Sequence, residues 1–474
     1  MARRRLHRDP SSKAAPVFRK GIPIIRAKPA KGLSHVHHDA AGIDIGATEH
    51  YVAVPAGRDE VCVRSFGTFT ADLYGLADWL QQCGVRTVAM ESTGIYWIPL
   101  FEVLESRGFE VRLVDPRKLK QVPGRKTDVL DCQWIQELHT YGLLEGCFRP
   151  ADQIVVLRAY MRQRDMLIRY AGQHVQHVQK ALEQMNVKLT EVIDDVMGET
   201  GSRIIEAILS GQRDPQALSK LRDYRCKNSE ATIALALEGN WRDEHLLELR
   251  QAWELYRVYL EKVSQVDTAL ESHLQTFEDR SGGQPLPELE KRKGGSKHEP
   301  QMTLELREYL FRLTGIDLTS MKGFGPHMLL GIISETGLDM TRFPTEKNFV
   351  SWLGLCPGNH KTGGRQKKSR SRTRPTSNHA ATLFRLGGAT LMNADCALGA
   401  YGRRMRSRLG SPKAITAVAH KLAQIFYNSL RHGRAYVDRG AATYEQRYRK
   451  WAEIGLRRKA AALGFELVAQ PAAT

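Results

Sequence analysis

The sequence has few cysteines and no long apolar segment. Its seven cysteines among 474 residues are scattered and never form a Cys-x-x-Cys pair, which argues against a disulfide framework and against a zinc site. No uncharged apolar run approaches the roughly 20 residues that span a bilayer, and the Arg-rich N-terminus lacks the apolar stretch of a signal peptide. We therefore expect a cytoplasmic protein and not a membrane or secreted one.

Positive charge is abundant, and it lies at the two ends of the chain. The 70 Lys and Arg against 52 Asp and Glu give a formal charge of +18. Residues 1–40 carry 10 bases and 2 acids, and residues 301–474 carry 28 and 11, which leaves residues 41–300 near −7. Basic ends suit nucleic acid, because binding releases the counterions condensed on phosphates. A solvated basic surface with no such partner is the alternative.

The first 150 residues predict a basic tail and one α/β domain. Residues 1–40 are rich in Arg, Lys and Pro and have little periodicity, as in a flexible tail. Within residues 41–150, β-branched runs predict strands and stretches with helical spacing predict helices. Strands that come first and then alternate with helices indicate a single sheet domain. We expect strands near 42–46, 51–54, 61–66, 87–90 and 110–114, and helices near 73–80, 98–106 and 127–141.

Residues 151–300 predict a helical arm with an insertion and a linker. Apolar residues recur at alternating spacings of three and four, the heptad pattern of a coiled coil, and Arg164 takes the one polar seam position. The same spacing from Leu249 to Val263 favours an antiparallel return helix, with residues 199–242 as a helical insertion. An ordinary helical bundle is the alternative. The seam comprises Ile168, Ala171, Val175, Val178, Leu182, Met185, Leu189, Val192 and Val196.

Four carboxylates of the α/β domain suggest a metal site. Asp44 lies in the first predicted strand, Glu91 follows a hydrophobic strand, and Asp128 and Asp131 are three residues apart on one helix face. Clustered carboxylates repel unless cations neutralise them, and hard oxygen ligands suit Mg²⁺ or Mn²⁺. Two such ions about 4 Å apart activate an attacking oxygen and stabilise a leaving oxygen of a phosphodiester. Singly, Asp44 could be a turn residue and Asp128 a helix N-terminal acid.

Residues 301–474 are predicted to be mostly helical, with two candidate phosphate contacts. The first is a Gly-x-Gly turn before an apolar helix, made by Lys322, Gly323 and Gly325, in which backbone N–H groups could meet a phosphate. This pattern predicts a helix-hairpin-helix contact to a DNA backbone. A plain helix–turn–helix corner is the alternative.

The second candidate is a basic loop that also carries a hydroxyl. Thr362 stands beside a Gly-Gly pair among cations, a setting that favours attack of a hydroxyl on phosphorus. The alternative is a loop that only grips phosphates. The binding residues predicted in this loop are Lys361, Gly363, Gly364, Arg365, Lys367, Lys368, Arg370, Arg372 and Arg374.

Taken in order, these motifs resemble the DEDD transposases of insertion sequences, which are bridge-RNA-guided recombinases. The resemblance runs from Gly42 to about Arg434. Its motifs are Gly42-Ile-Asp-Ile-Gly46, Glu91-Ser-Thr-Gly-Ile-Tyr96, Lys126-Thr-Asp-Val-Leu-Asp131, the Gly-Phe-Gly turn, and Trp352-Leu-Gly-Leu-Cys-Pro-Gly358 leading into the Gly-Gly segment.

The resemblance implies a ribonuclease-H-like (RuvC-like) domain, a coiled-coil arm used for assembly, and a mostly helical C-terminal transposase domain. The family's acids correspond to Asp44, Glu91, Asp128 and Asp131. It further implies a covalent protein–DNA link made by a C-terminal hydroxyl, DNA ends and target as substrates, a noncoding guide RNA, and a homo-oligomer, dimer or tetramer, in the bacterial cytoplasm near the nucleoid.

One position departs from the family pattern. The family's nucleophile is usually Ser, five residues after the Pro of its motif, and five residues after Pro357 stands Thr362. Thr keeps the hydroxyl but adds a methyl that restricts χ1. Either Thr362 serves, or Ser369 or Ser371 does, or this copy is catalytically weak.

We interpret the sequence as a Mg²⁺-dependent recombinase that moves its own element. A structure-selective nuclease without a covalent intermediate and a nucleic-acid-binding scaffold with a dead site are the two alternatives. Covalent protein–DNA adducts would distinguish the recombinase from both.

Overall fold

The computed structural model describes residues 34–116, 128–288, 299–358, 373–433 and 438–468, with the backbone alone for 128–130. It divides into two compact units, Met1–Arg149 and Pro150–Thr474. The arm and the C-terminal helices both belong to the second unit. Within the described part of the chain, no helix combines the length and the apolar character needed to cross a membrane.

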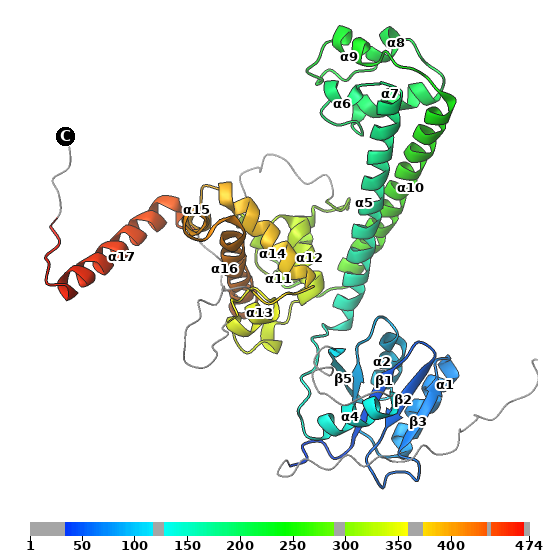
Figure 1. Ribbon diagram of the computed structural model, residues 1–474, viewed down its shortest axis with the longest axis vertical. Coiled ribbons are helices and arrows are strands. Elements are labelled where there is room, and N and C mark those ends of the chain that lie inside the picture. Colours follow the sequence, from blue (N-terminus) through cyan, green and yellow to red (C-terminus); the bar gives the residue numbers. More distant parts are fainter. Residues whose placement is uncertain (1–33, 117–127, 289–298, 359–372, 434–437, 469–474) are drawn as a thin grey trace, which may run out of the picture. The chain divides into compact units, whose positions relative to one another are not determined.

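The first unit is built on a mixed five-stranded sheet with the order β3-β2-β1-β4-β5. β1 pairs antiparallel with β2 and parallel with β4, and β4 pairs parallel with β5. Figure 1 shows the strands side by side with helices around them. The strands are β1 (Ala40–Ile45), β2 (Glu49–Ala53), β3 (Val63–Gly67), β4 (Thr87–Glu91) and β5 (Glu110–Val114). These positions confirm the predicted strands.

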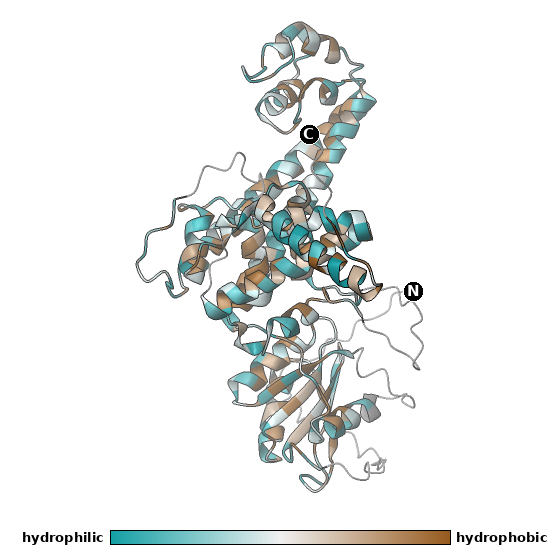
Figure 2. Ribbon diagram, turned by 90° about the vertical axis from the view of Figure 1, so that its left-hand side faces the viewer, coloured by the Kyte–Doolittle hydropathy of each residue, from teal (hydrophilic) through white to brown (hydrophobic). Residues whose placement is uncertain are grey.

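Helices cover the sheet on opposite faces. Ile43 and Met90 point into an apolar core together with Leu76, Leu80 and Leu104 of α1 and α2. On the other face Ala89 and Val114 pack against Ile135 of α4. Figure 2 shows hydrophobic stretches, in brown, along the strands of this sheet. The helices are α1 (Thr70–Gln82), α2 (Trp97–Ser106) and α4 (Asp128–Thr140).

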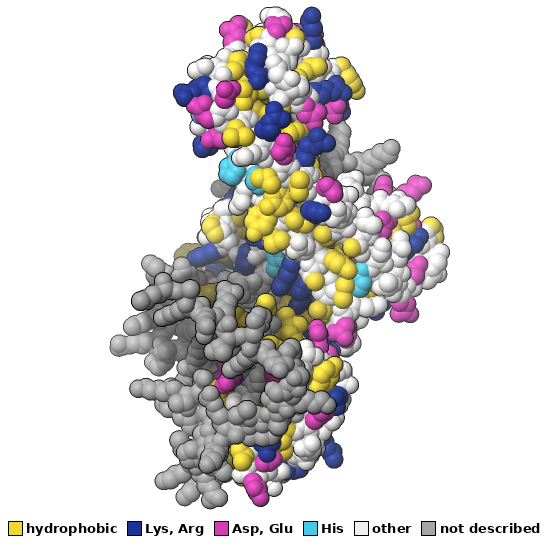
Figure 3. All heavy atoms as spheres, turned by 90° about the vertical axis from the view of Figure 1, so that its right-hand side faces the viewer, with side chains coloured by type: hydrophobic (Ala, Val, Ile, Leu, Met, Phe, Trp, Pro, Cys, Tyr) yellow, Lys and Arg dark blue, Asp and Glu magenta, His cyan; other side chains and the backbone are white. Residues whose placement is uncertain are grey.

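The arm in the second unit is an antiparallel pair of long helices, α5 (Asp152–Gln184) and α10 (Asp243–Leu274). The imidazole of His273 is 2.8 Å from the carbonyl of Gln153, and farther along the pair the rings of His174 and Tyr259 stack at 5.4 Å, so the helices run antiparallel. The return helix is thus confirmed. Hydrophobic side chains remain exposed among charged ones on the surface shown in Figure 3, and the exposed residues of the arm include Tyr170, Leu255 and Val258.

The heptad pattern runs past the end of its helix. α5 stops at Gln184, and Asn186 has a positive φ of 56°, so the chain turns there. Leu189, Val192 and Val196 pack instead into a small helical cap, and the prediction of one continuous seam over residues 168–196 was wrong beyond residue 184. The cap comprises α6 (Leu189–Val192), α7 (Glu199–Leu209), α8 (Pro215–Ser219) and α9 (Glu230–Ala236).

The C-terminal helices enclose an aromatic core. Phe324, Phe349, Phe384 and Phe426 are fully buried, with ring centroids of neighbouring pairs 5.7 to 6.4 Å apart. Burying four such rings removes a large apolar surface from water. The elements are α11 (Leu306–Thr314), η1 (Leu318–Ser320), α12 (Pro326–Thr336), η2 (Met340–Arg342), α13 (Glu346–Trp352), α14 (His379–Thr390), η3 (Leu391–Asn393), α15 (Ala397–Leu409), α16 (Ser411–His432) and α17 (Gly440–Ala462).

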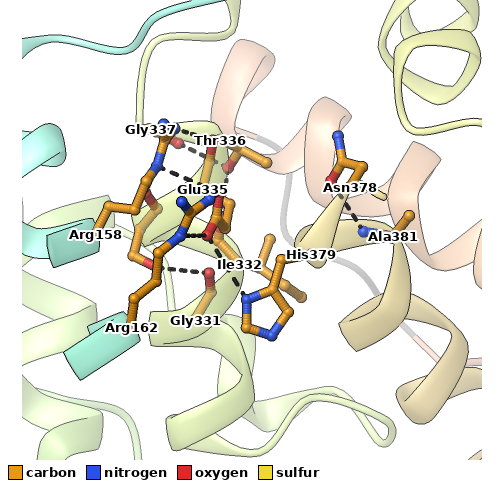
Figure 4. A network of polar contacts seen from close by, with 11 residues as sticks. Arg158, Arg162, Gly331, Ile332, Glu335, Thr336, Gly337, Asn378, His379 and Ala381 are labelled. Carbon is orange, nitrogen blue, oxygen red and sulfur yellow. Dashed lines mark hydrogen bonds and ion pairs between the residues drawn. The ribbon is translucent and has the colours of Figure 1, made fainter. Parts of the chain in front are cut away.

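A buried carboxylate fastens the arm to this helical body. Arg162 of α5 donates two hydrogen bonds, of 2.9 and 3.0 Å, to Glu335 of α12, and Arg158 donates to the Glu335 carbonyl at 2.8 Å (Figure 4). Burial alone would raise the pKa of Glu335, but hydrogen bonds from His379 and Arg162 and the charges of both arginines lower it to about 2. The carboxylate therefore stays ionised and fixes one end of the arm.

A second buried ion pair joins the two arm helices. Arg164 and Asp267 are each 2% exposed, and Nε of Arg164 donates to Oδ1 of Asp267 at 2.5 Å. Oδ2 of Asp267 also accepts the backbone N–H of Gln301 at 3.0 Å. The polar residue in the apolar seam is thus satisfied from the opposite helix, as a buried charge requires.

We expect Arg164→Met to destabilise the second unit by about 3–5 kcal/mol, because Asp267 would keep a buried charge without its partner. Urea unfolding followed by far-UV circular dichroism measures this. The double variant Arg164→Met/Asp267→Leu should recover most of the loss, since two apolar groups replace the pair. Equal instability of the single and double variants would contradict the charge argument.

Candidate active site at the sheet edge

Asp44 and Glu91 occupy matching positions on neighbouring parallel strands. Ile43 of β1 is paired with Met90 of β4, so the next position brings Asp44 beside Glu91 where both strands end. Side chains alternate across a strand. Because Ile43 and Met90 face the core under α1 and α2, the two carboxylates lie on the face that α4 covers, and both are half-buried.

Gly42 determines how closely α4 approaches these acids. A Cβ at Gly42 would lie 2.2 Å from the backbone nitrogen of Gln136 and 2.4 Å from the carbonyl oxygen of Cys132. The backbone of α4 therefore packs directly against β1. The side-chain amide of Gln136 donates a hydrogen bond to the Ala40 carbonyl at 3.3 Å. This contact places Asp131, one residue before Cys132, over the strand that carries Asp44.

The negative charges of Asp44 and Asp131 both affect the pKa of the Cys132 thiol. Burial, together with these negative charges, raises the pKa of Cys132 to about 12. Such a charge effect falls off with distance. Asp44 and Asp131, which are 87 positions apart in the sequence, therefore lie on the same side of the sheet near this buried thiol.

The acids supply the kind of ligand atom that a hard cation binds, but the described side chains do not form a complete metal site. Carboxylate oxygens are the donors that Mg²⁺ and Mn²⁺ take. Among the side chains that the structure describes, no three His, Cys, Asp or Glu residues are grouped so as to hold a metal ion. Asp128 is the first residue of α4, one turn before Asp131, and its side chain lies outside the described atoms.

Two polar contacts at this edge were not predicted from the sequence. The hydroxyl of Thr93 donates to Oε1 of Glu91 at 2.6 Å, and the hydroxyl of Tyr51, which is paired with Asp44 across β1 and β2, donates to Glu49 at 3.1 Å. The Ser-Thr-Gly sequence after Glu91 was a signal for the first contact, because a hydroxyl two residues away can reach back to a carboxylate.

A buried histidine at the opposite end of the sheet was also missed. His139 of α4 is fully buried, with Nε2 2.9 Å from the Thr87 hydroxyl, and burial lowers the pKa of His139 to about 4. Thr87 begins β4 and Glu91 ends it, so His139 lies away from the acids. It is a neutral packing residue of this domain.

The Gly-Phe-Gly turn is shaped by packing. Gly323 has a φ of +101°, and a Cβ there would lie 2.7 Å from the Leu391 side chain. Phe324 is buried in the aromatic core, and Lys322 donates to the carbonyl of Asp395 at 2.7 Å. Gly325 is the N-cap residue of α12, and no side chain caps the helix there. The predicted contact of this turn with a DNA backbone stays a prediction.

The basic loop with the candidate nucleophile lies outside the described residues. This holds for Thr362, Ser369 and Ser371 and for the predicted binding residues from Lys361 to Arg372. The ends of the loop are described: Pro357 and Thr373 form an antiparallel bridge, and Arg374 beside it is exposed. The bridge brings together two positions that are 16 apart in the sequence.

An α/β sheet with acids at the ends of adjacent parallel strands, together with a basic helical unit, is the arrangement of an enzyme that acts on nucleic acid. Comparison with known proteins defines the family. A family model described as "Transposase" matches residues 41–187, and a second, described as "Transposase IS116/IS110/IS902 family", matches residues 317–401. A "Probable family 20 transposase" of Pseudomonas aeruginosa is 22% identical over 293 residues, which cover 61% of this chain and 67% of that protein.

The chain therefore carries two segments that match transposase families, the first of them the DEDD transposases, and it is a DNA transposase. The first matched segment contains the four acids, and the second contains the Gly-Phe-Gly turn and the basic loop. Most of α15 and all of α17 lie beyond both segments.

We expect Gly42→Ala to displace α4 and reduce the free energy of unfolding of the first unit by at least about 2 kcal/mol, because the new methyl would overlap backbone atoms that cannot rotate away. Thermal unfolding of the purified variant measures this. Gly75→Ala in α1 is the matched control: a Cβ there meets nothing within 4 Å, and alanine favours a helix. Equal stability of the two variants would show that α4 is not held at Gly42.

Proposed function

We propose that the protein cuts and rejoins DNA to move an insertion sequence, with Asp44, Glu91, Asp128 and Asp131 as the ligands of Mg²⁺ or Mn²⁺. The observation that carries the proposal is the matched register of Asp44 and Glu91, with Asp131 on the helix that covers the same face. When bound, the cation would stabilise negative charge on the oxygens of the reacting phosphodiester. We also propose that this sheet domain is ribonuclease-H-like.

We propose Thr362 as the residue that supplies the attacking hydroxyl. Its oxygen would form a bond to phosphorus, its proton would pass to solvent or to a base, and the bond from phosphorus to one deoxyribose oxygen would break. Cations around it in the sequence would stabilise the charge that develops on the phosphoryl oxygens. The bridge between Pro357 and Thr373 supports this role, because it holds together the two described ends of the segment whose sequence contains Thr362.

We also propose that the protein has two kinds of partner. A noncoding guide RNA and a homo-oligomer follow from the family resemblance, with the arm of α5 and α10 as the assembly element. Exposed apolar side chains on the arm, such as Leu255 and Val258, support a contact there. Leu182 and Met185, in contrast, are buried within the chain's own cap, so they would not meet another subunit directly.

Each of the variants Asp44→Asn, Glu91→Gln, Asp128→Asn and Asp131→Asn should lower recombination about 100-fold or more, because a charge-stabilising ion is weakened when one ligand loses its charge. Recombination of a paired donor and target in Mg²⁺ measures this, with DNA binding and folding checked separately. Glu102→Gln in α2, an exposed acid on the helix that covers the opposite face, is the control. Near-normal recombination by two of the four variants would contradict a shared metal site.

Thr362→Ala should eliminate covalent protein–DNA adducts with little change in DNA affinity, whereas Thr362→Ser should keep or raise their yield, because it retains the hydroxyl without the crowding methyl. Denaturing electrophoresis of trapped adducts, followed by peptide mapping, measures both. Adducts of Thr362→Ala that map to Ser369 or Ser371 would move the nucleophile. Cleavage in Mg²⁺ without any adduct in the unmodified protein would favour the nuclease.

A further inference from the structure

The helix α17 has no buried residue, although it carries several large aromatic and aliphatic side chains. Trp451 is 74% exposed and Tyr448 is 45% exposed. α17 packs beside α15, as Figure 1 also shows. A soluble helix normally turns such residues toward a core, so the exposed aromatic residues on α17 need another explanation.

The aromatic residues form a ladder with an arginine of α15. The guanidinium of Arg404 lies 3.7 Å from the ring centroid of Tyr448 and 5.0 Å from that of Tyr444. Tyr444, Tyr448 and Trp451 follow one another at spacings of four and three, so they line one face of α17. Trp451 stands at the open end of this aromatic ladder. One turn further, a Cβ at Gly455 would meet nothing within 4 Å, so the surface beside the indole is unobstructed.

Positive charge surrounds the aromatic ladder. α17 contains six Lys and Arg against two acids, and α15 contains four Arg and no acid. Arg447 lies four residues before Trp451 and Arg458 seven residues after it, so both flank the indole on the helix surface. Glu453, one of the two acids of α17, is paired with Arg457 at 2.8 Å. The exposed indole therefore faces solvent among cations.

We propose that α15 and α17 form a binding surface for single-stranded DNA, with one base stacked on Trp451 and the neighbouring phosphates on Arg447 and Arg458. Stacked aromatic rings in a basic setting are the general means of binding unpaired strands. Duplex DNA hides its base faces, so it would contact only the cations. The protein is a DNA transposase, so cleaved or unpaired DNA is the single strand that its own reaction supplies.

The surface suits a membrane less well. A helix that lies on a bilayer needs a broad apolar face. On α17, Leu456 follows Trp451 by five residues and lies roughly 140° around the helix from it, at about 100° per residue. The apolar residues are thus spread around α17, while the aromatic stripe is narrow and flanked by arginines. The residues that make this surface, from Arg404 to Arg458, lie outside both segments that match the family models, and none of them belongs to the carboxylate site.

The test is fluorescence anisotropy of a labelled single-stranded oligothymidylate with the full chain. We expect Trp451→Ala to weaken binding about 5- to 100-fold, the effect of losing one base stack, and Trp451→Phe to retain most of the affinity. Gly455→Glu should also weaken binding, because it adds an acid next to the indole while a Cβ fits there freely. Leu456→Ala, on the same helix but off the aromatic stripe, is the matched control and should bind normally.

Ultraviolet cross-linking of a bromodeoxyuridine-substituted strand should map to the peptide that contains Trp451, and a duplex of the same sequence should compete poorly. Equal binding by Trp451→Ala and Leu456→Ala would overturn the proposal. So would preferred binding of oligouridylate, capture by phosphatidylserine vesicles that depends on Trp451, or a smaller oligomer of Trp451→Ala in sedimentation. These experiments measure binding only. Their outcome therefore does not depend on whether the carboxylate site carries out recombination.

Discussion

The candidate active site depends on one close contact, the backbone of α4 resting on strand β1 at Gly42. No side chain separates the two elements there, since even a methyl would lie 2.2 Å from a backbone nitrogen. The contact brings Asp131 from a helix distant in sequence to the face that carries Asp44 and Glu91. A greater distance between α4 and β1 would move the acids apart, and a metal ion requires its ligands within a few ångströms of one another.

Buried charge gives the second unit its geometry. Arg164 and Asp267 join the two arm helices, and Glu335 joins the arm to the C-terminal helices through Arg158, Arg162 and His379. A buried ion pair adds little net stability compared with apolar residues of the same size, but it tolerates very few arrangements. We infer that these pairs fix the register of α5 against α10 and the position where α12 meets α5.

The family motifs serve two different purposes in this fold. Gly42 and Gly323 are required by packing, against α4 and against Leu391, and Phe324 is a core residue. Asp44, Glu91 and Asp131 are half-buried at the end of the sheet, where packing alone gives no reason for three acids. Charge of one sign gathered on one face costs free energy unless something neutralises it, which is why these residues point to chemistry.

The α/β domain, the return helix, the family resemblance and the candidate acids could all be predicted from the order of residues, because strand and helix periods and short motifs are local properties. The sequence pattern did not predict where α5 ends: the spacing of three and four continues through residue 196, but the chain turns at Asn186 and the same apolar residues fill the cap. Neither the ion pair between Arg164 and Asp267 nor the position of α17 outside the core was predicted from the sequence. Those outcomes depend on which surfaces pack against one another in three dimensions, and a local pattern of residues does not specify contacts between segments that are distant in the sequence.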